Sequence, residues 1–459
     1  MRTRRRAAGV ALALAAASHL FVVPSSAVAQ AQGGIVLPVR SHWQTLADSR
    51  HVYVSAPGDD AVVATDHDGQ VVKKVEGLDG ARGMAESADE STLYVALPEA
   101  DAIAVIDTAT LTETRRISTG ADTQPESLAL AGGRLFFGYQ ATVFDAGIGS
   151  VDIAEATPTV TLDDHPVWSG KPRLASSPGA PDRLVAAESQ GALGMRVYDV
   201  RSGTLQETAY SDAVADVEDV AVTPDGSTVI TANGSTYYHQ RWRLPDLTEV
   251  SQYDTGPYPN SVAVDSHGTV AAGIVAGGEW DVHVYRPGET AAYRTVALSP
   301  GYADLLARGL AWAPDGNRLF TTRFPYSGEV VLDVVTDIAK ASSTITLSAP
   351  PTNPVGTPVT VTGKLTSMVP FPKRRTVTVT RSGVELPDVK VKRDGTFSFS
   401  DTPPDWNTYP QYTVTYAGDD RHVPGTATVM VEFVPSPVVG GTSGTESGPR
   451  PDHRFAAAH

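Results

Sequence analysis

The feature that most constrains this chain is an internal repeat of seven two-strand units. Each unit is an apolar strand, a tight polar turn and a second apolar strand, and successive second strands begin 41 to 49 residues apart. Four short strands and their turns fill such an interval. The seven units are Trp43–Val54, Met84–Val95, Leu128–Gly138, Leu174–Ala187, Val220–Ala232, Val262–Gly273 and Leu310–Thr322.

Seven units of this size should close into a ring, because an open row of sheets would leave both end sheets exposed. The last unit lacks a fourth strand of its own, since a polar stretch follows Glu329–Val335. Conversely, Ile35–Val39 precedes the first unit and has no sheet of its own. We therefore predict an all-β fold in which Ile35–Val39 completes and locks a seven-bladed β-propeller over residues 30–340.

The tight turns support this alignment of the units. Pro-Asp-Gly occupies the turn at residues 224–226 and again at 314–316, where proline fixes φ and glycine accepts a positive φ. Ala88-Asp89-Glu90 and Ala47-Asp48-Ser49 occupy the same position with less favourable turn residues.

The second unit resembles a known repeat. Val105-Ile106-Asp107-Thr108-Ala109-Thr110 and Leu93-Tyr94-Val95-Ala96 are similar to the repeat of YVTN-type β-propellers, which are WD40-like in architecture, and Val229–Asn233 resembles the name-giving strand. The resemblance extends over about residues 34–338. It implies the fold and leaves the activity open, because propellers include binding proteins and enzymes alike.

The N-terminus predicts export. Four arginines among the first six residues precede the apolar run Ala7–Val23, and Ala27-Val28-Ala29 offers a cleavage site. We expect residues 1–29 to be a signal peptide and the product to be secreted, either extracellular or loosely associated with a cell wall. Later apolar runs are too short to span a bilayer, so we expect no stable membrane insertion. The chain has no cysteine, which excludes disulfides and thiolate chemistry.

Charge is distributed unevenly along the chain. The net charge is −16, but residues 30–340 carry 21 basic and 42 acidic side chains, whereas residues 341–434 carry 9 and 8. The acidic body argues against nucleic acid as a partner. Simple solubility also explains the acidity, and we favour that interpretation.

Residues 341–434 change in character to short strands with alternating polarity, as in Val377 and Val379 between threonines. Seven such strands fit a β-sandwich. The segment Tyr412–Asp419 followed by Thr426–Val431 resembles bacterial immunoglobulin-like repeats, which implies a spacer or adhesion module. The polar, Gly- and Ser-rich residues 435–459 predict a disordered tail.

Catalytic motifs are missing from the sequence. It contains no Gly-x-Ser-x-Gly elbow, no His-Glu-x-x-His, no EF-hand loop and no phosphate-binding loop. The acidic pairs Asp59-Asp60 and Asp163-Asp164 are better explained as solvated turns than as metal ligands. We therefore assign no catalytic residue, no metal ligand and no cofactor.

The propeller itself predicts one special place, because the leading ends of the inner strands meet around a central channel. Arginine guanidinium groups, which donate hydrogen bonds, and glutamate carboxylates, which accept them, are expected at this place and can bind a polar ligand. They can equally pair with one another across neighbouring blades, and we favour that interpretation. The candidate ligand-binding residues at this channel mouth are Arg82, Glu126, Arg173, Glu218, Asn260 and Arg308.

Loop aromatics are expected near the same face and suit sugar rings or peptide side chains. They are Tyr139, Trp168, Tyr237, Tyr238, Tyr258, Tyr302, Phe324 and Tyr326. The leading hypothesis is an extracellular binding or scaffold protein whose partner is a carbohydrate, a peptide or another cell-surface component. The alternatives are a propeller enzyme, such as a lyase or lactonase, and a structural component of a cell wall or spore coat.

Overall fold

The computed structural model describes residues 34–435 apart from 143–144, 156, 164–167, 192, 235–236, 276–280, 299–302, 326–327 and 405–406. The expected signal peptide and nearly all of the expected tail lie outside the described residues. Regular structure in the described part is β throughout, apart from the short 3₁₀ turns η1 (Pro57–Asp59) and η2 (Pro98–Ala100). No helix there combines the length and apolar character needed to cross a membrane.

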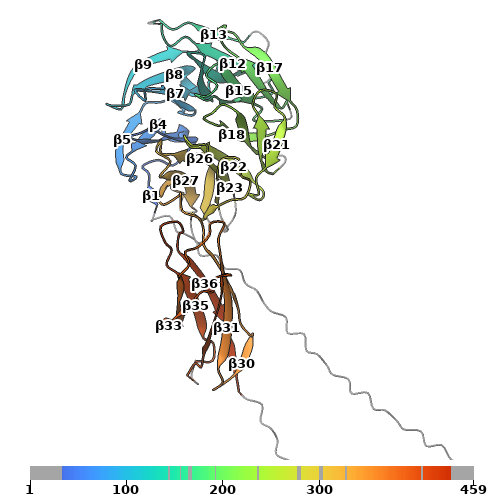
Figure 1. Cartoon of the computed structure of the whole chain (residues 1–459). Coiled ribbons are helices and arrows are strands. Elements are labelled where there is room, and N and C mark those ends of the chain that lie inside the picture. Colours follow the sequence, from blue (N-terminus) through green and yellow to red (C-terminus); the bar gives the residue numbers. More distant parts are fainter. Residues whose placement is uncertain are drawn as a thin grey trace, which may run out of the picture.

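The described strands between Ile35 and Val335 form seven four-stranded antiparallel sheets, arranged around a common centre (Figure 1). We number these sheets blades 1 to 7 in chain order. Blade 1 comprises β2 (Gln44–Ala47), β3 (Val52–Ala56), β4 (Ala61–Thr65) and β5 (Val71–Glu76); blade 2, β6 (Met84–Glu86), β7 (Thr92–Leu97), β8 (Ala102–Asp107) and β9 (Thr112–Ser118); blade 3, β10 (Leu128–Ala131), β11 (Arg134–Thr142), β12 (Asp145–Val151) and β13 (Val160–Leu162); blade 4, β14 (Arg173–Ala175), β15 (Arg183–Ala187), β16 (Met195–Asp199) and β17 (Gln206–Ser211).

The remaining blades follow the same order of strands. Blade 5 comprises β18 (Val217–Val222), β19 (Thr228–Asn233), β20 (His239–Arg243) and β21 (Glu249–Gln252); blade 6, β22 (Pro259–Val264), β23 (Val270–Ile274), β24 (Val282–Tyr285) and β25 (Arg294–Val296); blade 7, β26 (Ala303–Trp312), β27 (Leu319–Pro325), β28 (Val331–Val335) and β1 (Ile35–Val36).

Blade 7 takes its fourth strand from the other end of the ring, as the sequence predicted. β1 pairs antiparallel with β28, with Ile35 opposite Leu332 and Val36 opposite Val331. The strand is shorter than expected, but Leu37 continues the contact by donating its N–H to the carbonyl of Val330 at 2.9 Å. Leu37 and Val39 are buried in the apolar cluster between blades 7 and 1. The N-terminal segment therefore contributes both backbone pairing and core to the closure.

Hydrogen bonds between neighbouring blades continue around the whole ring. Gly83 shows how close the blades approach: its N–H donates to the Glu126 carbonyl at 2.9 Å, and a Cβ on Gly83 would lie 2.2 Å from that oxygen. The pairs, in ring order, are Met84 N to Gln44 Oε1, Gly83 N to Glu126 O, Leu174 N to Ser127 Oγ, Val217 N to Glu188 O, Val262 N to Asp219 Oδ2, Asn260 Nδ2 to Leu305 O and Arg308 Nε to Trp43 O.

Burial decreases from the centre of each blade outward, which explains the sequence pattern. The third strand of blade 2, β8, is apolar on both faces because it packs between two neighbours, whereas its outer strand β9 is mostly exposed. The turn at Asp89, whose residues are less favourable, is closed by the same aspartate hydrogen bond as the Pro-Asp-Gly turn at Asp225. Asp89 Oδ1 accepts from Ser91 N at 3.1 Å, and Asp225 Oδ1 accepts from Ser227 N at 3.0 Å. The shared aspartate closes both kinds of turn.

Residues 344–434 form three further sheets, which surround a single apolar cluster. One sheet has the order β29-β31-β34, the second β33-β32-β35-β36, and the third pairs β30 with β37 in parallel. The strands are β29 (Thr344–Ser348), β30 (Thr352–Pro354), β31 (Val359–Thr366), β32 (Thr376–Arg381), β33 (Val384–Lys390), β34 (Thr396–Asp401), β35 (Gln411–Tyr416), β36 (Gly425–Met430) and β37 (Glu432–Val434). The described residues of the module thus form nine strands, where the sequence predicted seven.

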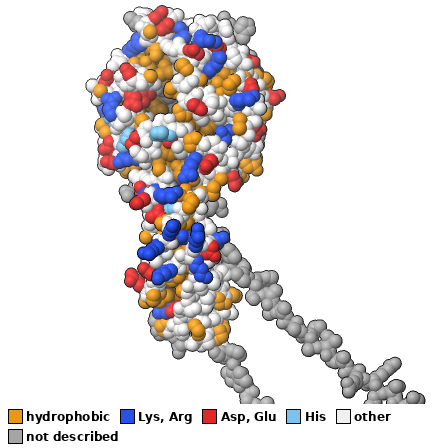
Figure 2. All heavy atoms as spheres, in the orientation of Figure 1, with side chains coloured by type: hydrophobic (Ala, Val, Ile, Leu, Met, Phe, Trp, Pro, Cys, Tyr) orange, Lys and Arg blue, Asp and Glu red, His pale blue; other side chains and the backbone are white. Residues whose placement is uncertain are grey.

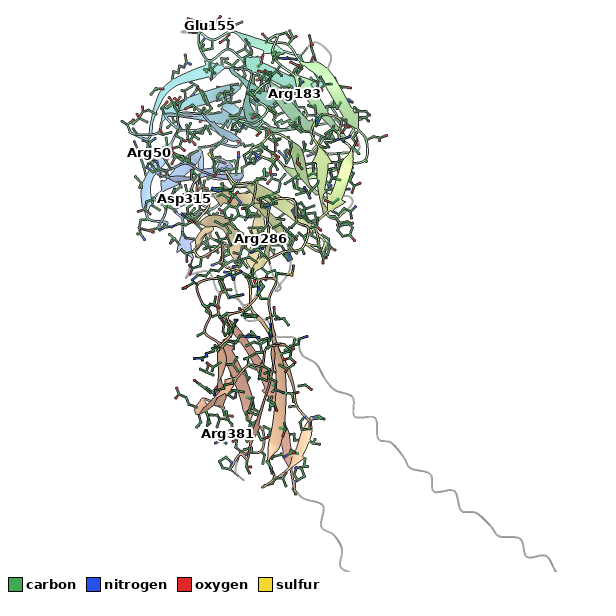
Figure 3. All side chains as sticks on the ribbon, in the orientation of Figure 1. Arg50, Glu155, Arg183, Arg286, Asp315 and Arg381 are labelled. Atoms are coloured by element: carbon green, nitrogen blue, oxygen red, sulfur yellow. The ribbon has the colours of Figure 1, made fainter. Side chains whose placement is uncertain are left out.

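An ion pair joins two sheets of this C-terminal module. Arg381 on β32 donates to both carboxylate oxygens of Asp401 on β34, at 2.9 Å each, and Tyr412 Oη donates to the same carboxylate. Figure 3 shows Arg381 in the half of the module away from the ring.

The other end of the module contacts blade 6 directly. Ser342 N donates to the Tyr293 carbonyl at 2.9 Å, and Val369 joins the apolar cluster formed with blades 6 and 7. His422 is fully buried at this junction, where its Nε2 lies 3.0 Å from the Val369 carbonyl and its Nδ1 lies 2.8 Å from Asp419 Oδ1. The module is therefore attached through both polar and apolar contacts.

Candidate binding site at the centre of the ring

The centre of the ring, where the inner strands begin, holds a carboxylate surrounded by three cations. Glu126, just before β10, pairs with Arg82, and its Oε1 accepts from Arg173 at 2.9 Å. Lys171 Nζ lies 3.5 Å from Glu126 Oε2. Burial alone would raise the pKa of Glu126, but the charges of Arg173, Arg82 and Lys171 outweigh it and lower that pKa. Glu126 is therefore ionised and neutralises part of this cationic group.

Trp43 connects this group to the opposite side of the ring. It lies just before β2 in blade 1, and its ring lies 5.2 Å from the guanidinium carbon of Arg173 in blade 4 and 4.3 Å from that of Arg308 in blade 7. Both distances suit cation–π attraction. Side chains from blades 4 and 7 therefore meet on the indole of a residue from blade 1, which places Trp43 across the centre of the mouth.

A bulge in β26 places Arg308. The pairing of β26 with β27 slips between Leu305 and Leu310, and Arg308 has a φ of +57°. Bulges redirect side chains in this way, and a positive φ at a residue other than glycine carries a conformational cost. Here Arg308 donates from Nε to the Trp43 carbonyl at 3.0 Å and from Nη1 to the Glu218 carbonyl at 2.9 Å. Burial lowers the pKa of Arg308 to about 10, so the group stays charged at neutral pH.

Two titratable groups at the mouth are shifted toward neutrality. Burial raises the pKa of Asp219 to about 6, although the N–H of Val262 and the charge of Arg308 oppose the shift. Burial, followed by the charge of Arg308, lowers the pKa of His42 to about 3. The ring of His42 bonds to the hydroxyl of Thr45, at 3.0 Å from Nε2. His42 is therefore neutral, and Asp219 changes charge in the mildly acidic range.

The structure thus brings together most of the predicted site residues. Arg82, Glu126 and Arg173 form one group, and Arg308 with Glu218 forms a second, with 4.0 Å between Arg308 Nη1 and Glu218 Oε2. The interpretation that these side chains pair with one another is supported. Two of them remain open to solvent, with 36% of the Arg82 side chain and 45% of the Glu218 side chain exposed.

Asn260 takes a different role. Its amide donates from Nδ2 to the carbonyl of Leu305 at 2.6 Å, which links blade 6 to the bulge of blade 7. Its Oδ1 is buried without a hydrogen-bond partner among the described residues. Asn260 therefore supports the mouth by holding β26 in place.

Sequence reasoning missed Trp43 and Lys171 as site residues. Trp43 had a signal: it is the first residue of the first unit, where the other six units begin with an aliphatic residue. Lys171 had none, because it lies in an irregular loop outside the repeat. With Lys171 included, three cations, Arg82, Lys171 and Arg173, surround the single carboxylate of Glu126. This balance is reversed relative to the acidic body.

The expected loop aromatics divide into two groups. Tyr139 and Trp168 are buried, so the expectation that they lie on the surface is wrong; both pack in apolar clusters between blades. Tyr237 and Tyr258 are exposed and contact each other edge to face, with 5.4 Å between ring centroids. Tyr238 and Phe324 are also exposed. The last two members of the set, Tyr302 and Tyr326, lie outside the described residues.

An acid pair lies at the opposite end of the inner strands. Burial and then the charge of Asp48 raise the pKa of Glu86 to about 9, while N–H donors from His51 and Arg50 outweigh burial and lower the pKa of Asp48. Asp48 also accepts from Tyr53 Oη at 2.8 Å. Because the oxygens of Asp48 are engaged by its own turn, we assign this pair to packing between blades 1 and 2.

A cavity of about 290 Å³ occupies the centre of the ring on the Glu86 side. Inner strands of blades 2 to 6 line it: Ala85, Glu86, Leu128, Ala129, Leu130, Leu174, Ala175, Ser176, Val220, Ala221, Val222 and Val264. In the described part of the chain, no group of three or more His, Asp or Glu side chains is arranged to hold a metal ion.

Comparison with known proteins identifies the fold. No family model matches the chain, and no curated protein matches its sequence. Among solved structures, hydrazine synthase from Kuenenia stuttgartiensis is 15% identical, with a TM-score of 0.52, over 66% of this chain and 98% of that chain. The β-propeller domain of Cps50 (Swd1) from Myceliophteria thermophila is 14% identical, with a TM-score of 0.52, over 66% and 99%. The ring is a β-propeller. At these identities the likeness shows the fold alone.

Proposed function

We propose that this chain is an extracellular binding protein that holds a carboxylate-bearing ligand, a peptide or a sugar, on the mouth face of its propeller. The observation that carries the proposal is the excess of cations around Trp43. Arg82, Lys171 and Arg173 share the one carboxylate of Glu126, and Arg308 lies over Trp43, in a body that is otherwise strongly acidic. Only 13–14% of the side chains of Lys171, Arg173 and Arg308 is exposed, and partial burial strengthens the attraction between such groups and an anion.

The exposed aromatics support a ligand larger than a simple ion. Tyr237 and Tyr258 stand at the mouth-side ends of strands in blades 5 and 6, and 57% of Tyr258 is exposed. Tyrosine rings offer an apolar face and a hydroxyl, which suits sugars and peptide side chains. In this arrangement the central cations take the carboxylate, and the tyrosines contact the body of the ligand.

The enzyme alternative would be favoured by a histidine paired with a carboxylate at the mouth. The ring of His42 instead bonds the hydroxyl of Thr45, and His42 is neutral. This geometry favours binding over catalysis. A purely structural role in a cell wall or spore coat would not require a cluster of cations at the mouth.

The proposed organisation completes this picture. Residues 1–29 act as a signal peptide, residues 30–340 form a seven-bladed propeller of the YVTN type, residues 341–434 form an immunoglobulin-like spacer, and residues 435–459 are a tail. The seven four-stranded sheets and the separate apolar core of the C-terminal module support it. N-terminal sequencing of the exported protein should begin at Gln30.

Binding is tested with the mature protein on an array of acidic and neutral glycans and peptides. We expect carboxylate-bearing members to bind, and Arg82→Ala to weaken their affinity by about tenfold, because a charged hydrogen bond contributes about 1.5–3 kcal/mol. Arg40→Ala removes an exposed charge from the propeller and is the matched control. Equal binding by neutral members, or unchanged affinity in Arg82→Ala, would contradict the proposal.

A further inference from the structure

A second concentration of positive charge lies on the C-terminal module, at the end that faces the ring (Figure 2). Lys373 and Arg374 lie in the loop between β31 and β32, and Lys392 and Arg393 lie in the loop between β33 and β34, which belong to different sheets. All four side chains are exposed, and none forms an ion pair with a carboxylate among the described residues. Four unpaired like charges in two adjacent loops repel one another, so the arrangement favours an anionic ligand.

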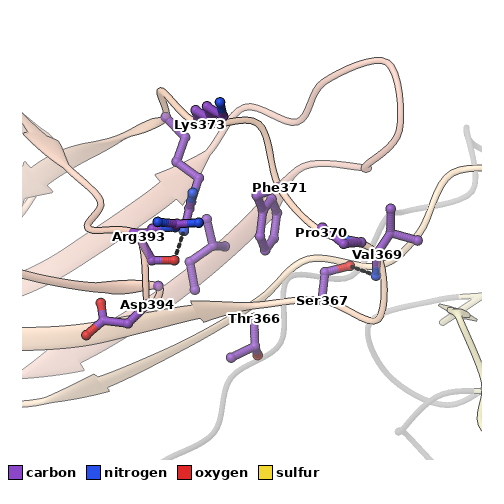
Figure 4. Close-up of a pocket in the computed structure, with 11 residues that line it drawn as sticks. Thr366, Ser367, Val369, Pro370, Phe371, Lys373, Arg393 and Asp394 are labelled. Atoms are coloured by element: carbon purple, nitrogen blue, oxygen red, sulfur yellow. Dashed lines mark hydrogen bonds between the residues drawn. The ribbon is translucent and has the colours of Figure 1, made fainter.

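These loops enclose a pocket of about 730 Å³ (Figure 4). Its lining combines cations, hydroxyls and one aromatic ring: Leu365, Thr366, Ser367, Val369, Pro370, Phe371, Lys373, Arg375, Arg393, Asp394 and Gly395. Asp394 is the single carboxylate among these residues, and its Oδ1 is engaged by the N–H and hydroxyl of Thr396, at 3.0 and 2.7 Å. Lys373, Arg375 and Arg393 outnumber this one carboxylate, so the pocket carries a net positive charge of two.

The pocket is held in shape by Arg375. Its Nη2 donates to the carbonyls of Lys392 and Arg393, at 2.8 and 3.2 Å, and its Nη1 donates to the carbonyl of Pro372 at 3.0 Å. One guanidinium thus ties together the two loops that carry the exposed cations. Phe371 is fixed from another side, because it stacks on the buried His422 with 4.2 Å between ring centroids. The site is organised before any ligand arrives, which reduces the entropic cost of binding.

We propose that this pocket binds an acidic polysaccharide, a chain of sugars that carry carboxylates. Lys373 and Arg393 would take the carboxylates, and the hydroxyls of Thr366 and Ser367 would bond to sugar hydroxyls. The acidic propeller repels any polyanion that extends over it, so we expect a short stretch of such sugars to occupy the pocket. The proposal does not rest on the proposed function of the mouth, since it concerns other residues in another module.

The test uses the full mature protein and oligogalacturonate as the probe, with neutral dextran and polyphosphate as comparisons. Affinity is measured at 50 and 200 mM salt. We expect oligogalacturonate to bind more tightly than either comparison and to weaken with salt. The double variant Lys373→Ser, Arg393→Ser should lose about tenfold in affinity and keep its melting temperature, because both side chains are exposed.

The matched control is Arg40→Ser with Lys73→Ser, which removes the same charge from the propeller and should change affinity by less than about twofold. Because the mouth also takes carboxylates under the proposed function, adding Arg82→Ala to the double variant separates the two sites: any oligogalacturonate affinity that survives the double variant belongs to the mouth and should fall when Arg82 is replaced. Unaltered affinity in the Lys373, Arg393 double variant would overturn the proposal. So would equal binding of dextran, tighter binding of polyphosphate, or a loss that follows Arg82 in place of the pocket.

Discussion

Glu126 Oε1 accepts a hydrogen bond from Arg173 Nη1 at 2.9 Å, across the boundary between blades 3 and 4. The same carboxylate pairs with Arg82 of blade 2, so one acid joins three consecutive blades. Only 11% of the Glu126 side chain is exposed, so these charges are largely removed from water. The arrangement explains why the mouth keeps its cations close together: Glu126 offsets their mutual repulsion.

Replacing Glu126 by glutamine should destabilise the propeller and strengthen binding of anions. The variant leaves Arg82, Lys171 and Arg173 without their shared counter-charge, and loss of one partner of a buried pair costs about 3–5 kcal/mol, somewhat less here because the amide retains an acceptor. Urea unfolding measures the first effect, and titration with the ligand found on the array measures the second.

Glu218→Gln is the control for that experiment. Its carboxylate lies 4.0 Å from Arg308 Nη1 and is half exposed, so we expect a change below about 1 kcal/mol. Equal effects of the two substitutions would show that net charge, and not the buried cluster, sets the stability.

Asp219 should make stability depend on pH between about 4 and 6. Its pKa is raised to about 6 in the folded chain, whereas an unfolded aspartate has a pKa of about 3.9. Below pH 4 the group is protonated in both states. As pH rises toward 6 the unfolded state loses this proton first, so the folded state becomes less stable, by roughly 3 kcal/mol once the transition is complete.

Asp219→Asn removes this contribution while keeping an acceptor for the N–H of Val262. The free energy of unfolding of the variant, relative to the wild type, should therefore rise between pH 4 and 6 and stay level above 7. Parallel pH profiles for the two proteins would contradict the assignment.

Ile35–Val39 should be essential for closure of the ring. A chain beginning at Arg40 would lose the pairing of β1 with β28 and the buried side chains of Leu37 and Val39. Burial of each such side chain contributes about 1.5–3 kcal/mol, so we expect a loss of at least about 3 kcal/mol in urea unfolding. A chain beginning at Gly34 keeps the strand and should match the full mature protein. If both chains unfolded alike, closure would depend on other contacts.

The repeat carried enough information to predict the ring and its closure, because strand alternation and turn chemistry are local properties of the sequence. Ile35–Val39 could be placed because one blade lacked a strand. The sequence placed Tyr139 and Trp168 in loops, but Tyr139 lies within the long strand β11, and both side chains are buried between blades. The length of β11 and the inward packing of Trp168 depend on neighbouring blades, so the local pattern does not encode them.

The candidate site could be predicted only where the repeat places its residues. Counting positions from the start of each unit found Arg82, Glu126 and Arg173, because the repeat places equivalent residues around one mouth. Lys171 lies in an irregular loop, and the direction of Arg308 depends on a bulge that periodicity does not encode. The pocket of the C-terminal module depends on two loops meeting, which is a tertiary property.

Arg308→Lys should destabilise the propeller although it conserves charge. Lysine and arginine bear the same conformational cost at the positive φ of position 308, so the comparison isolates the effect of the guanidinium. Arg308 uses that group in three ways at once: two hydrogen bonds, to the carbonyls of Trp43 and Glu218, and a stacked contact with the Trp43 ring. An ammonium is a single compact charge and cannot reproduce this set.

We expect Arg308→Lys to lower the free energy of unfolding by about 1–3 kcal/mol, since carbonyl oxygens at the mouth lose their donors. Tryptophan fluorescence should change in the folded state, because the surroundings of Trp43 become more polar when the guanidinium no longer covers it. Arg40→Lys, at an exposed position, provides the matched control and should leave both quantities unchanged. Identical stability and fluorescence in Arg308→Lys would mean that charge alone holds Trp43 across the mouth, and that the bulge in β26 serves another purpose.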